Sequence, residues 1–201
     1  MTRTVGIYIF NDVEVLDFAG PYEVFSTASR VHQRSHPQEE IPYSVQLIAT
    51  ESKAIEARGG MKLLPDFRCS QISRIDVLIV PGGLIERELE RDELIGWIRS
   101  LSQFAEIMAS VCTGVFILAK AGLLEGLSAT THWDDIEEFS QMFPEVKVIK
   151  NKRWVEEGHI LTSAGISAGI DMSLHIVSML GGQDLAELTA RQMDYRWQEN
   201  F

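Results

Sequence analysis

The feature of this sequence that most constrains its fold is a series of short apolar runs alternating with stretches of helical periodicity. Residues 5–10, 77–80 and 106–111 are dominated by aliphatic and β-branched side chains. Continuous runs of this kind are typical of strands buried on both faces, as in parallel sheets whose connections are helices. The alternation predicts an α/β fold with a mostly parallel sheet and helices on both of its faces.

The remaining elements follow from the same two periodicities. Proline is favoured in the first turn of a helix, so a helix is expected to begin after Gly20-Pro21 and to run toward His36-Pro37. Further helices are expected at residues 89–104, 113–124, 134–143, 168–180 and from about 184 onward. Strands are expected at residues 43–50 and 127–131, a hairpin at 55–64, and a meander from 146–149, 153–155 and 159–162.

Length and composition indicate one folded domain spanning residues 1–201. The chain is 45% hydrophobic and 23% charged. These proportions exclude disordered and fibrous classes. No repeat, low-complexity stretch or proline-rich linker divides the sequence.

The charge balance and the apolar runs exclude two classes of partner. Eighteen basic and 29 acidic residues give a net charge of −11, so attraction to the phosphates of nucleic acids is not expected. A membrane span requires roughly 18 apolar residues. No apolar run approaches that length, and no secretory signal is expected. The two cysteines, Cys69 and Cys112, are expected to be reduced thiols in a cytoplasmic protein.

Cys112 is the main candidate nucleophile. It lies between an expected strand and an expected helix in Ala109-Ser110-Val111-Cys112-Thr113-Gly114, and small neighbours are what a sharp strand-to-helix turn requires. The N-terminus of the following helix would favour the thiolate and lower the pKa of the thiol. The alternative from the residues alone is an ordinary buried cysteine. Cys69 lies in a polar stretch and lacks this setting.

Three other segments are expected to reach the same edge of the sheet. The backbone N–H groups of Pro81-Gly82-Gly83 follow a buried strand and, with that of Thr113, could form an oxyanion hole. Asp17 is an acid among apolar neighbours just after the first strand, and His132 follows another strand. Each also has a purely structural interpretation. Pro81-Gly82-Gly83 could be a plain tight turn, Asp17 could form local hydrogen bonds at a helix start, and His132 could be a hydrogen-bonded structural histidine.

Two motifs are interpreted as incidental. Gly165-Ile166-Ser167-Ala168-Gly169 matches the serine-hydrolase elbow, but no separate acid and histidine follow it, so Ile166 and Ser167 are expected only to line a site. His32 and His36 have a metal-like spacing without an acidic third ligand. No metal is expected at this pair. No cofactor is expected either, and neither a phosphate loop nor a dinucleotide fingerprint is present.

Taken in order, Leu16-Asp17-Phe18-Ala19-Gly20-Pro21, Pro81-Gly82-Gly83, Ser110-Val111-Cys112-Thr113-Gly114 and Ala129-Thr130-Thr131-His132-Trp133 resemble the DJ-1/PfpI (ThiJ/PfpI) superfamily over nearly the whole chain. The last two segments are most similar to the isonitrile hydratase branch and to the sensor domains of some AraC-type regulators. The resemblance implies a flavodoxin-like three-layer sandwich, a homodimer and a reactive cysteine.

The resemblance also implies roles for individual residues. Cys112 takes the position of the nucleophile, Asp17 that of the acid contacting the thiol, and His132 that of a nearby histidine. Gly83 and Thr113 take the positions of the oxyanion-hole amides, with Gly82 beside them. Trp133, Ile166 and Ser167 are expected to line the substrate site. Peptidases of the superfamily have histidine directly after the cysteine, whereas this chain has Thr113, which argues against peptidase chemistry.

Three functions remain open at this point. The first is hydration of an isonitrile to an N-substituted formamide by Cys112 and Asp17. The second is a noncatalytic or redox-responsive sensor of small molecules, in which Cys112 is oxidised beside Asp17. The third is a glyoxalase- or deglycase-like activity on α-oxoaldehydes that would use Cys112 with His132. A homodimer is expected through the apolar final helices or through the surface of the first helix around residues 22–31.

Overall fold

A seven-stranded sheet forms the centre of the computed structural model, which describes residues 1–198. The strand order is β10-β11-β7-β6-β1-β2-β5, and every neighbouring pair is parallel except β10 and β11. The strands are β1 (Arg3–Tyr8), β2 (Tyr43–Ala49), β5 (Phe67–Arg68), β6 (Val77–Val80), β7 (Ile107–Val111), β10 (Trp154–Glu157) and β11 (Ile160–Ser163).

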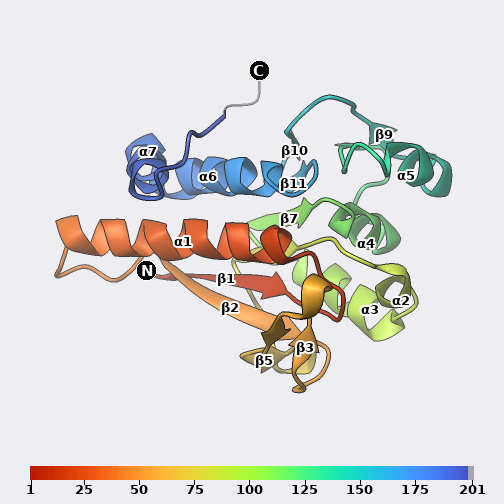
Figure 1. Ribbon diagram of the computed structural model, residues 1–201, viewed down its shortest axis with the longest axis horizontal. Coiled ribbons are helices and arrows are strands. Elements are labelled where there is room, and N and C mark those ends of the chain that lie inside the picture. Colours follow the sequence, from red (N-terminus) through yellow and green to blue (C-terminus); the bar gives the residue numbers. More distant parts are fainter. Residues whose placement is uncertain (199–201) are drawn as a thin grey trace.

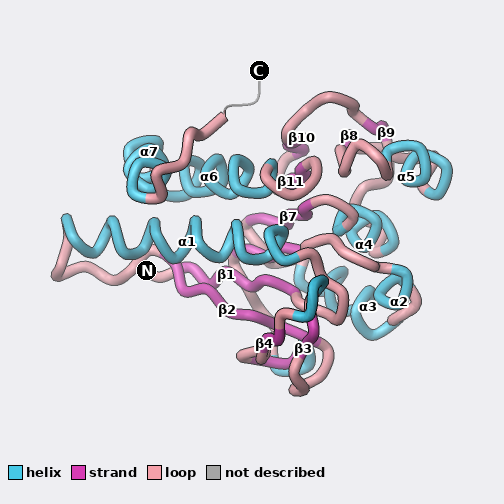
Figure 2. Tube along the Cα trace, viewed as in Figure 1, coloured by secondary structure: helices cyan, strands magenta, loops and turns pink. Residues whose placement is uncertain are grey.

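Two groups of helices complete the three layers (Figures 1 and 2). One group packs together from α1 (Val15–Ser35), α6 (Ala168–Gly181) and α7 (Gln183–Gln192). The other contains α2 (Glu86–Leu89), α3 (Asp92–Leu101) and α4 (Gly114–Lys120). The predicted flavodoxin-like sandwich is therefore confirmed.

The first helix begins earlier than the sequence predicted. α1 starts at Val15, so Pro21 lies inside the helix instead of in its first turn. A proline at this position removes one helical N–H donor. Buried residues before and after it, Phe18 and Val24, pack on the core and hold both parts of the helix in place.

The predicted meander is wrong. β10 and β11 form an antiparallel hairpin, but β9 (Lys147–Val148) instead pairs in parallel with β8 (Ser128–Ala129) in a separate small sheet. Helix α5 (Ile136–Met142) lies between β8 and β9 along the chain. A parallel crossover depends on where that helix packs, which local sequence does not specify.

Smaller elements account for the rest of the chain. The predicted hairpin is present as β3 (Ile55–Glu56) and β4 (Lys62–Leu63), joined by the 3₁₀ turn η1 (Arg58–Gly60). A second 3₁₀ turn, η2 (Cys69–Gln71), buries Cys69 although the sequence around it is polar. Among residues 1–198, no helix is both long and apolar enough to cross a membrane.

Strands at the centre of the sheet are buried, and their parallel direction positions the site. β6 and β7 are buried at every residue, as predicted for strands covered on both sides. Because β1, β6, β7 and β11 are parallel, their carboxyl ends meet at one edge of the sheet. The segments that follow these four strands therefore converge there.

Candidate active site

Cys112 occupies a sharp turn between β7 and α4. Its φ of 55° lies in the left-handed region. Such a conformation is uncommon for a residue with a side chain and is frequent at functional sites. Gly114 is needed for this turn, since a Cβ there would lie 2.0 Å from the carbonyl oxygen of Val80. The Cys112 backbone is held by its N–H to Ser163 O at 3.2 Å and by Thr131 Oγ1, which donates to Cys112 O at 2.9 Å. The predicted strand-to-helix elbow is present.

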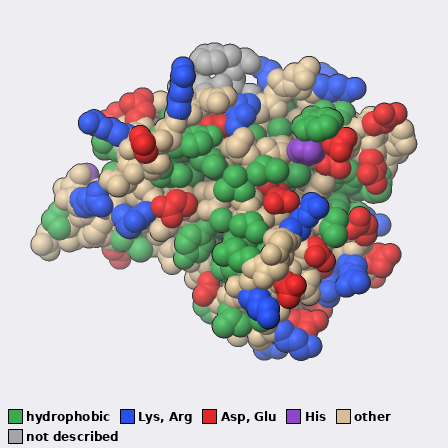
Figure 3. All heavy atoms as spheres, viewed as in Figure 1, with side chains coloured by type: hydrophobic (Ala, Val, Ile, Leu, Met, Phe, Trp, Pro, Cys, Tyr) green, Lys and Arg blue, Asp and Glu red, His purple; other side chains and the backbone are tan. Residues whose placement is uncertain are grey.

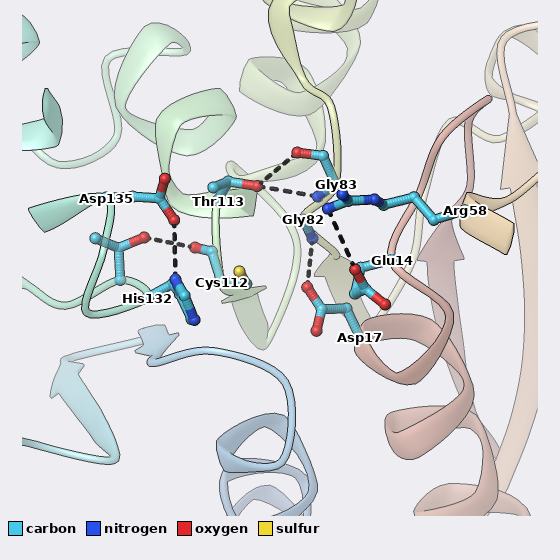
Figure 4. A network of polar contacts seen from close by, with 10 residues as sticks. Glu14, Asp17, Arg58, Gly82, Gly83, Cys112, Thr113, His132 and Asp135 are labelled. Atoms are coloured by element: carbon cyan, nitrogen blue, oxygen red, sulfur yellow. Dashed lines mark hydrogen bonds and ion pairs between the residues drawn. The ribbon is translucent and has the colours of Figure 1, made fainter.

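Asp17 lies next to the thiol, on the first turn of α1 (Figure 4). The side chain is fully buried, and Oδ2 accepts a hydrogen bond from the N–H of Gly82 at 3.1 Å. The other oxygen, Oδ1, lacks a hydrogen bond of normal geometry. Burial raises the pKa of Asp17 to about 7, against the smaller opposing effects of the Gly82 amide and the Cys112 thiol. Asp17 can therefore exchange a proton near neutral pH.

The thiol itself does not show the lowered pKa that its place before a helix suggested. Burial, and then the negative charge of Asp17, raise the pKa of Cys112 to about 12, while the Thr113 amide acts in the opposite direction. Cys112 is only 8% exposed. The effect of the helix terminus is outweighed because burial in apolar surroundings raises the pKa of a thiol. In its resting form the pair is thus a thiol beside a carboxyl group, and the thiol proton must leave before the sulfur can attack.

The predicted oxyanion-hole residues Gly83 and Thr113 line the same hollow as Cys112, but the amide of Gly83 is already hydrogen-bonded. Thr113 Oγ1 accepts a hydrogen bond from the N–H of Gly83 at 3.0 Å and donates one to Gly83 O at 3.1 Å. The amide of Gly83 is therefore bound to Thr113 in this structure. The Thr113 amide acts on the sulfur directly and favours its ionised form.

His132 reaches the opposite side of the sulfur (Figure 4). Its Nδ1 lies 3.3 Å from Asp135 Oδ2, and ligand atoms of Cys112, His132 and Asp135 are all within 4.8 Å of one another. The ring packs on Gly165, where a Cβ would lie 2.0 Å from His132 Cδ2. Asp135 was not expected from the sequence, although its position three residues after His132 is a usable signal for a side-chain pair.

A hollow of about 300 Å³ opens in front of Cys112. Apolar side chains form part of its wall, from Leu84, Ile85, Leu89, Phe116, Met142 and Ile166. Its charged residues are mostly acidic: Glu14, Glu86, Asp134, Asp135 and Glu138 against Arg58, which pairs with Glu14 at 3.5 Å. Anionic substrates are disfavoured by this lining, and neutral or cationic ones are not.

Trp133 and Ser167 lie outside this hollow, in a neighbouring one that shares His132 and Ile166 with it. Trp133 is 75% exposed, and Ser167 Oγ accepts a hydrogen bond from Arg153 Nη2 at 3.3 Å. Arg153 also pairs with the buried Asp171. The structure thus does not bring Trp133 or Ser167 against the thiol.

The hydrolase-like motif of the sequence analysis has a packing role. Gly165 accommodates His132, and the serine bonds to Arg153 instead of to a histidine base. The pair His32 and His36 is also separate from the site: the rings stack at 4.6 Å, and His32 Nε2 lies 3.4 Å from Glu39.

Comparisons with known proteins show what the chain is similar to. The family model described as "DJ-1/PfpI family" matches residues 3–179. The isonitrile hydratase of Pseudomonas putida is 32% identical over 197 residues, covering 97% of this chain and 79% of that protein. The transcriptional regulator CdhR of Pseudomonas aeruginosa is 28% identical over 192 residues, and the matched region is 96% of this chain but only 55% of the regulator.

Similarity to solved structures supports the fold. A ThiJ/PfpI family protein from Pseudomonas syringae superposes with a TM-score of 0.85 at 23% identity, covering 100% of this chain and 78% of the other. DJ-1beta of Drosophila melanogaster superposes with a TM-score of 0.83 at 20% identity, over 98% of this chain and 100% of the other.

Proposed function

The chain belongs to the DJ-1/PfpI family, and from that premise we propose that it is a cysteine-dependent enzyme that hydrates an isonitrile to an N-substituted formamide. Cys112 is the nucleophile and Asp17 transfers protons. The Cys112 thiol beside a buried carboxyl group, at the bottom of a partly apolar hollow, is the observation that carries this proposal. The 32% identity to an isonitrile hydratase supports it.

In the first step the thiol adds to the terminal carbon of the isonitrile. Asp17, whose pKa is about 7, accepts the thiol proton as the sulfur attacks, and then delivers that proton to the same carbon. A carbon–sulfur bond and a carbon–hydrogen bond form, and the product is a thioimidate linked to Cys112. Water exclusion around the buried pair favours this internal transfer over loss of the proton to solvent.

In the second step water hydrolyses the thioimidate. Water adds to the carbon, one of its protons goes to the substrate nitrogen, and the carbon–sulfur bond then breaks to release the formamide and the thiol. His132 is within reach of the sulfur and is held by Asp135, so we assign it to orient this water. Asp135 is a positioning residue, because it acts through His132.

The lining of the hollow fits the charge and the apolar character of such a substrate. An isonitrile is neutral, and its carbon substituent would contact apolar residues such as Leu84, Phe116 and Ile166. A carboxylate or phosphate would instead meet several acidic side chains.

Ligand sensing is the second candidate function. The similarity to CdhR covers nearly all of this chain but about half of that regulator, so the same domain occurs within a transcriptional regulator. In that case the hollow would bind a small molecule, or Cys112 would be oxidised, without turnover.

Turnover measurements distinguish the hydratase from the sensor. Purified protein and its Cys112→Ala variant are incubated with cyclohexyl isocyanide, and the formamide is quantified, with methylglyoxal as a parallel substrate. Formamide production by the wild-type protein alone would support the hydratase. Absence of turnover on the isonitrile, together with selective oxidation of Cys112 by dilute peroxide, would support the sensor. Turnover of methylglyoxal instead would indicate α-oxoaldehyde chemistry.

We also propose that the chain forms a homodimer through the exposed face of α1. Most apolar residues of α6, including Met172, Leu174 and Ile176, are buried within the chain, so α6 does not need a partner to cover it. Tyr22 on α1 is 39% exposed and Ile41 is 41% exposed, and both line one shallow hollow. The space-filling view shows hydrophobic side chains gathered across the middle of one face of the molecule (Figure 3).

A further inference from the structure

The side chains of Cys112, His132 and Asp135 form a cluster with more than one chemical use. Their ligand atoms lie within 4.8 Å of one another, and all three residues line the same hollow. Sulfur, imidazole nitrogen and carboxylate oxygen are the three donor types that zinc binds in proteins. We propose that these three residues bind one divalent transition-metal ion of the zinc class, which blocks the nucleophile reversibly.

The distances are close to those a metal ion requires. Zinc bonds of about 2.0 to 2.3 Å place neighbouring tetrahedral ligands roughly 3.5 Å apart. His132 Nδ1 and Asp135 Oδ2 are already 3.3 Å apart. The two side chains are only partly buried and lie on the loop before α5. A shift of these side chains by about 1 Å therefore brings the three ligand atoms to bonding distance around one ion.

The surroundings also favour a cation. Three protein ligands leave the fourth tetrahedral position facing the hollow, where water can occupy it. Asp134 and Glu138 add negative charge to the lining, and Arg58 of the lining pairs with Glu14. Binding replaces the thiol proton by the metal: the sulfur–hydrogen bond breaks, a sulfur–metal bond forms, and the proton passes to the buffer.

Inhibition of catalysis by the bound metal rests on the proposed function. Metal binding itself does not depend on that proposal. A sulfur bound to zinc has given its lone pair to the metal and cannot attack a substrate carbon. A chelator such as EDTA would remove the metal and restore catalytic activity.

Cobalt(II) absorption measures the site without reference to activity, because a cobalt–thiolate bond gives a near-ultraviolet charge-transfer band. One ion per chain is expected, with the band absent in Cys112→Ala. His132→Gln and Asp135→Asn should each weaken cobalt and zinc affinity by about tenfold or more. Circular dichroism checks that each variant is folded.

Three variants serve as controls. Asp134→Asn removes a neighbouring acid of the same hollow, Cys69→Ala removes the other thiol, and His36→Ala removes a surface imidazole. Cys69→Ala and His36→Ala should bind cobalt with unchanged affinity, and Asp134→Asn, which removes a nearby charge but no ligand, should weaken binding by much less than tenfold. A band that survives in Cys112→Ala, no band in the wild type, or unchanged affinity in Asp135→Asn and His132→Gln would overturn the site. Binding as expected with unimpaired formamide production would overturn only its inhibitory role.

Discussion

Asp17 is a carboxyl group buried where a neutral side chain would be more stable. Its pKa of about 7 means that the folded chain holds this proton more tightly than the unfolded chain does. The folded state therefore loses stability as the pH rises from about 4 to about 7. A functional carboxyl that costs stability is the trade-off expected at an active site.

The variant Asp17→Asn tests this cost. Asparagine keeps an oxygen for the Gly82 amide but carries no charge at any pH. The free energy of unfolding of Asp17→Asn minus that of the wild-type protein should grow by roughly 3 kcal/mol between about pH 5 and pH 8. Urea unfolding at several pH values measures the difference. A difference that does not change with pH would show that Asp17 ionises normally.

The same residue sets the expected dependence of activity on pH. Asp17 must be deprotonated to accept the thiol proton, so kcat/KM should rise with pH around an apparent pKa of about 7 and then level off. Asp17→Asn should lower kcat by about a hundredfold or more. A flat profile from about pH 5 to pH 9 would assign proton transfer to another group.

At the residue scale, the sequence was sufficient for the residues with distinctive neighbours. Cys112 stands in a pattern that implies its place at a strand end, Asp17 follows the first strand among apolar neighbours, and the structure brings the two together. The raised pKa of Cys112 was not predictable, because it depends on burial by segments far away in the chain. Asp135 was missed since an acid near a helix start has many ordinary explanations.

Among the elements, the turn between β7 and α4 tolerates no side chain at Gly114. An alanine Cβ would lie 2.0 Å from the Val80 carbonyl oxygen, which belongs to the backbone of β6 and cannot move freely. We expect Gly114→Ala to lower the free energy of unfolding by about 2 kcal/mol or more and to displace Cys112. Thermal unfolding and the reaction rate of Cys112 with a thiol reagent measure both effects.

Gly96 provides a matched comparison. It lies in α3, and a Cβ there would have no neighbour within 4 Å. Gly96→Ala should raise the free energy of unfolding by roughly 0.5 to 1 kcal/mol, because alanine favours the helix. Equal effects of the two substitutions would refute the steric explanation of the turn.

The accuracy of the predicted elements follows the strength of their local signals. β6 was predicted with the observed bounds, since an apolar run closed by Pro81-Gly82 has one interpretation. The start of α1 was misplaced because Pro21 resembles a helix beginning, while packing of residues on both sides of it decides otherwise. The pairing of β8 with β9 was missed because it depends on tertiary contacts.

For the whole molecule, the proposed dimer predicts that the mass of the particle in solution stays the same across the dilution series. Light scattering across a dilution series should give twice the mass of one chain for the wild-type protein. Tyr22→Arg places a charge in the exposed face of α1 and should shift the population toward the monomer. A wild-type mass near 22.6 kDa at all concentrations would exclude the dimer.

Mass analysis of Cys112 during turnover tests the central claim most directly. The protein is mixed with excess cyclohexyl isocyanide, quenched with acid after milliseconds to seconds, digested and analysed by mass spectrometry. We predict that the peptide containing Cys112 transiently gains the mass of one isocyanide molecule, and that this adduct decays as formamide accumulates. Formamide formation without any adduct on Cys112, or at the same rate in Cys112→Ala, would contradict the assignment of this thiol as the nucleophile.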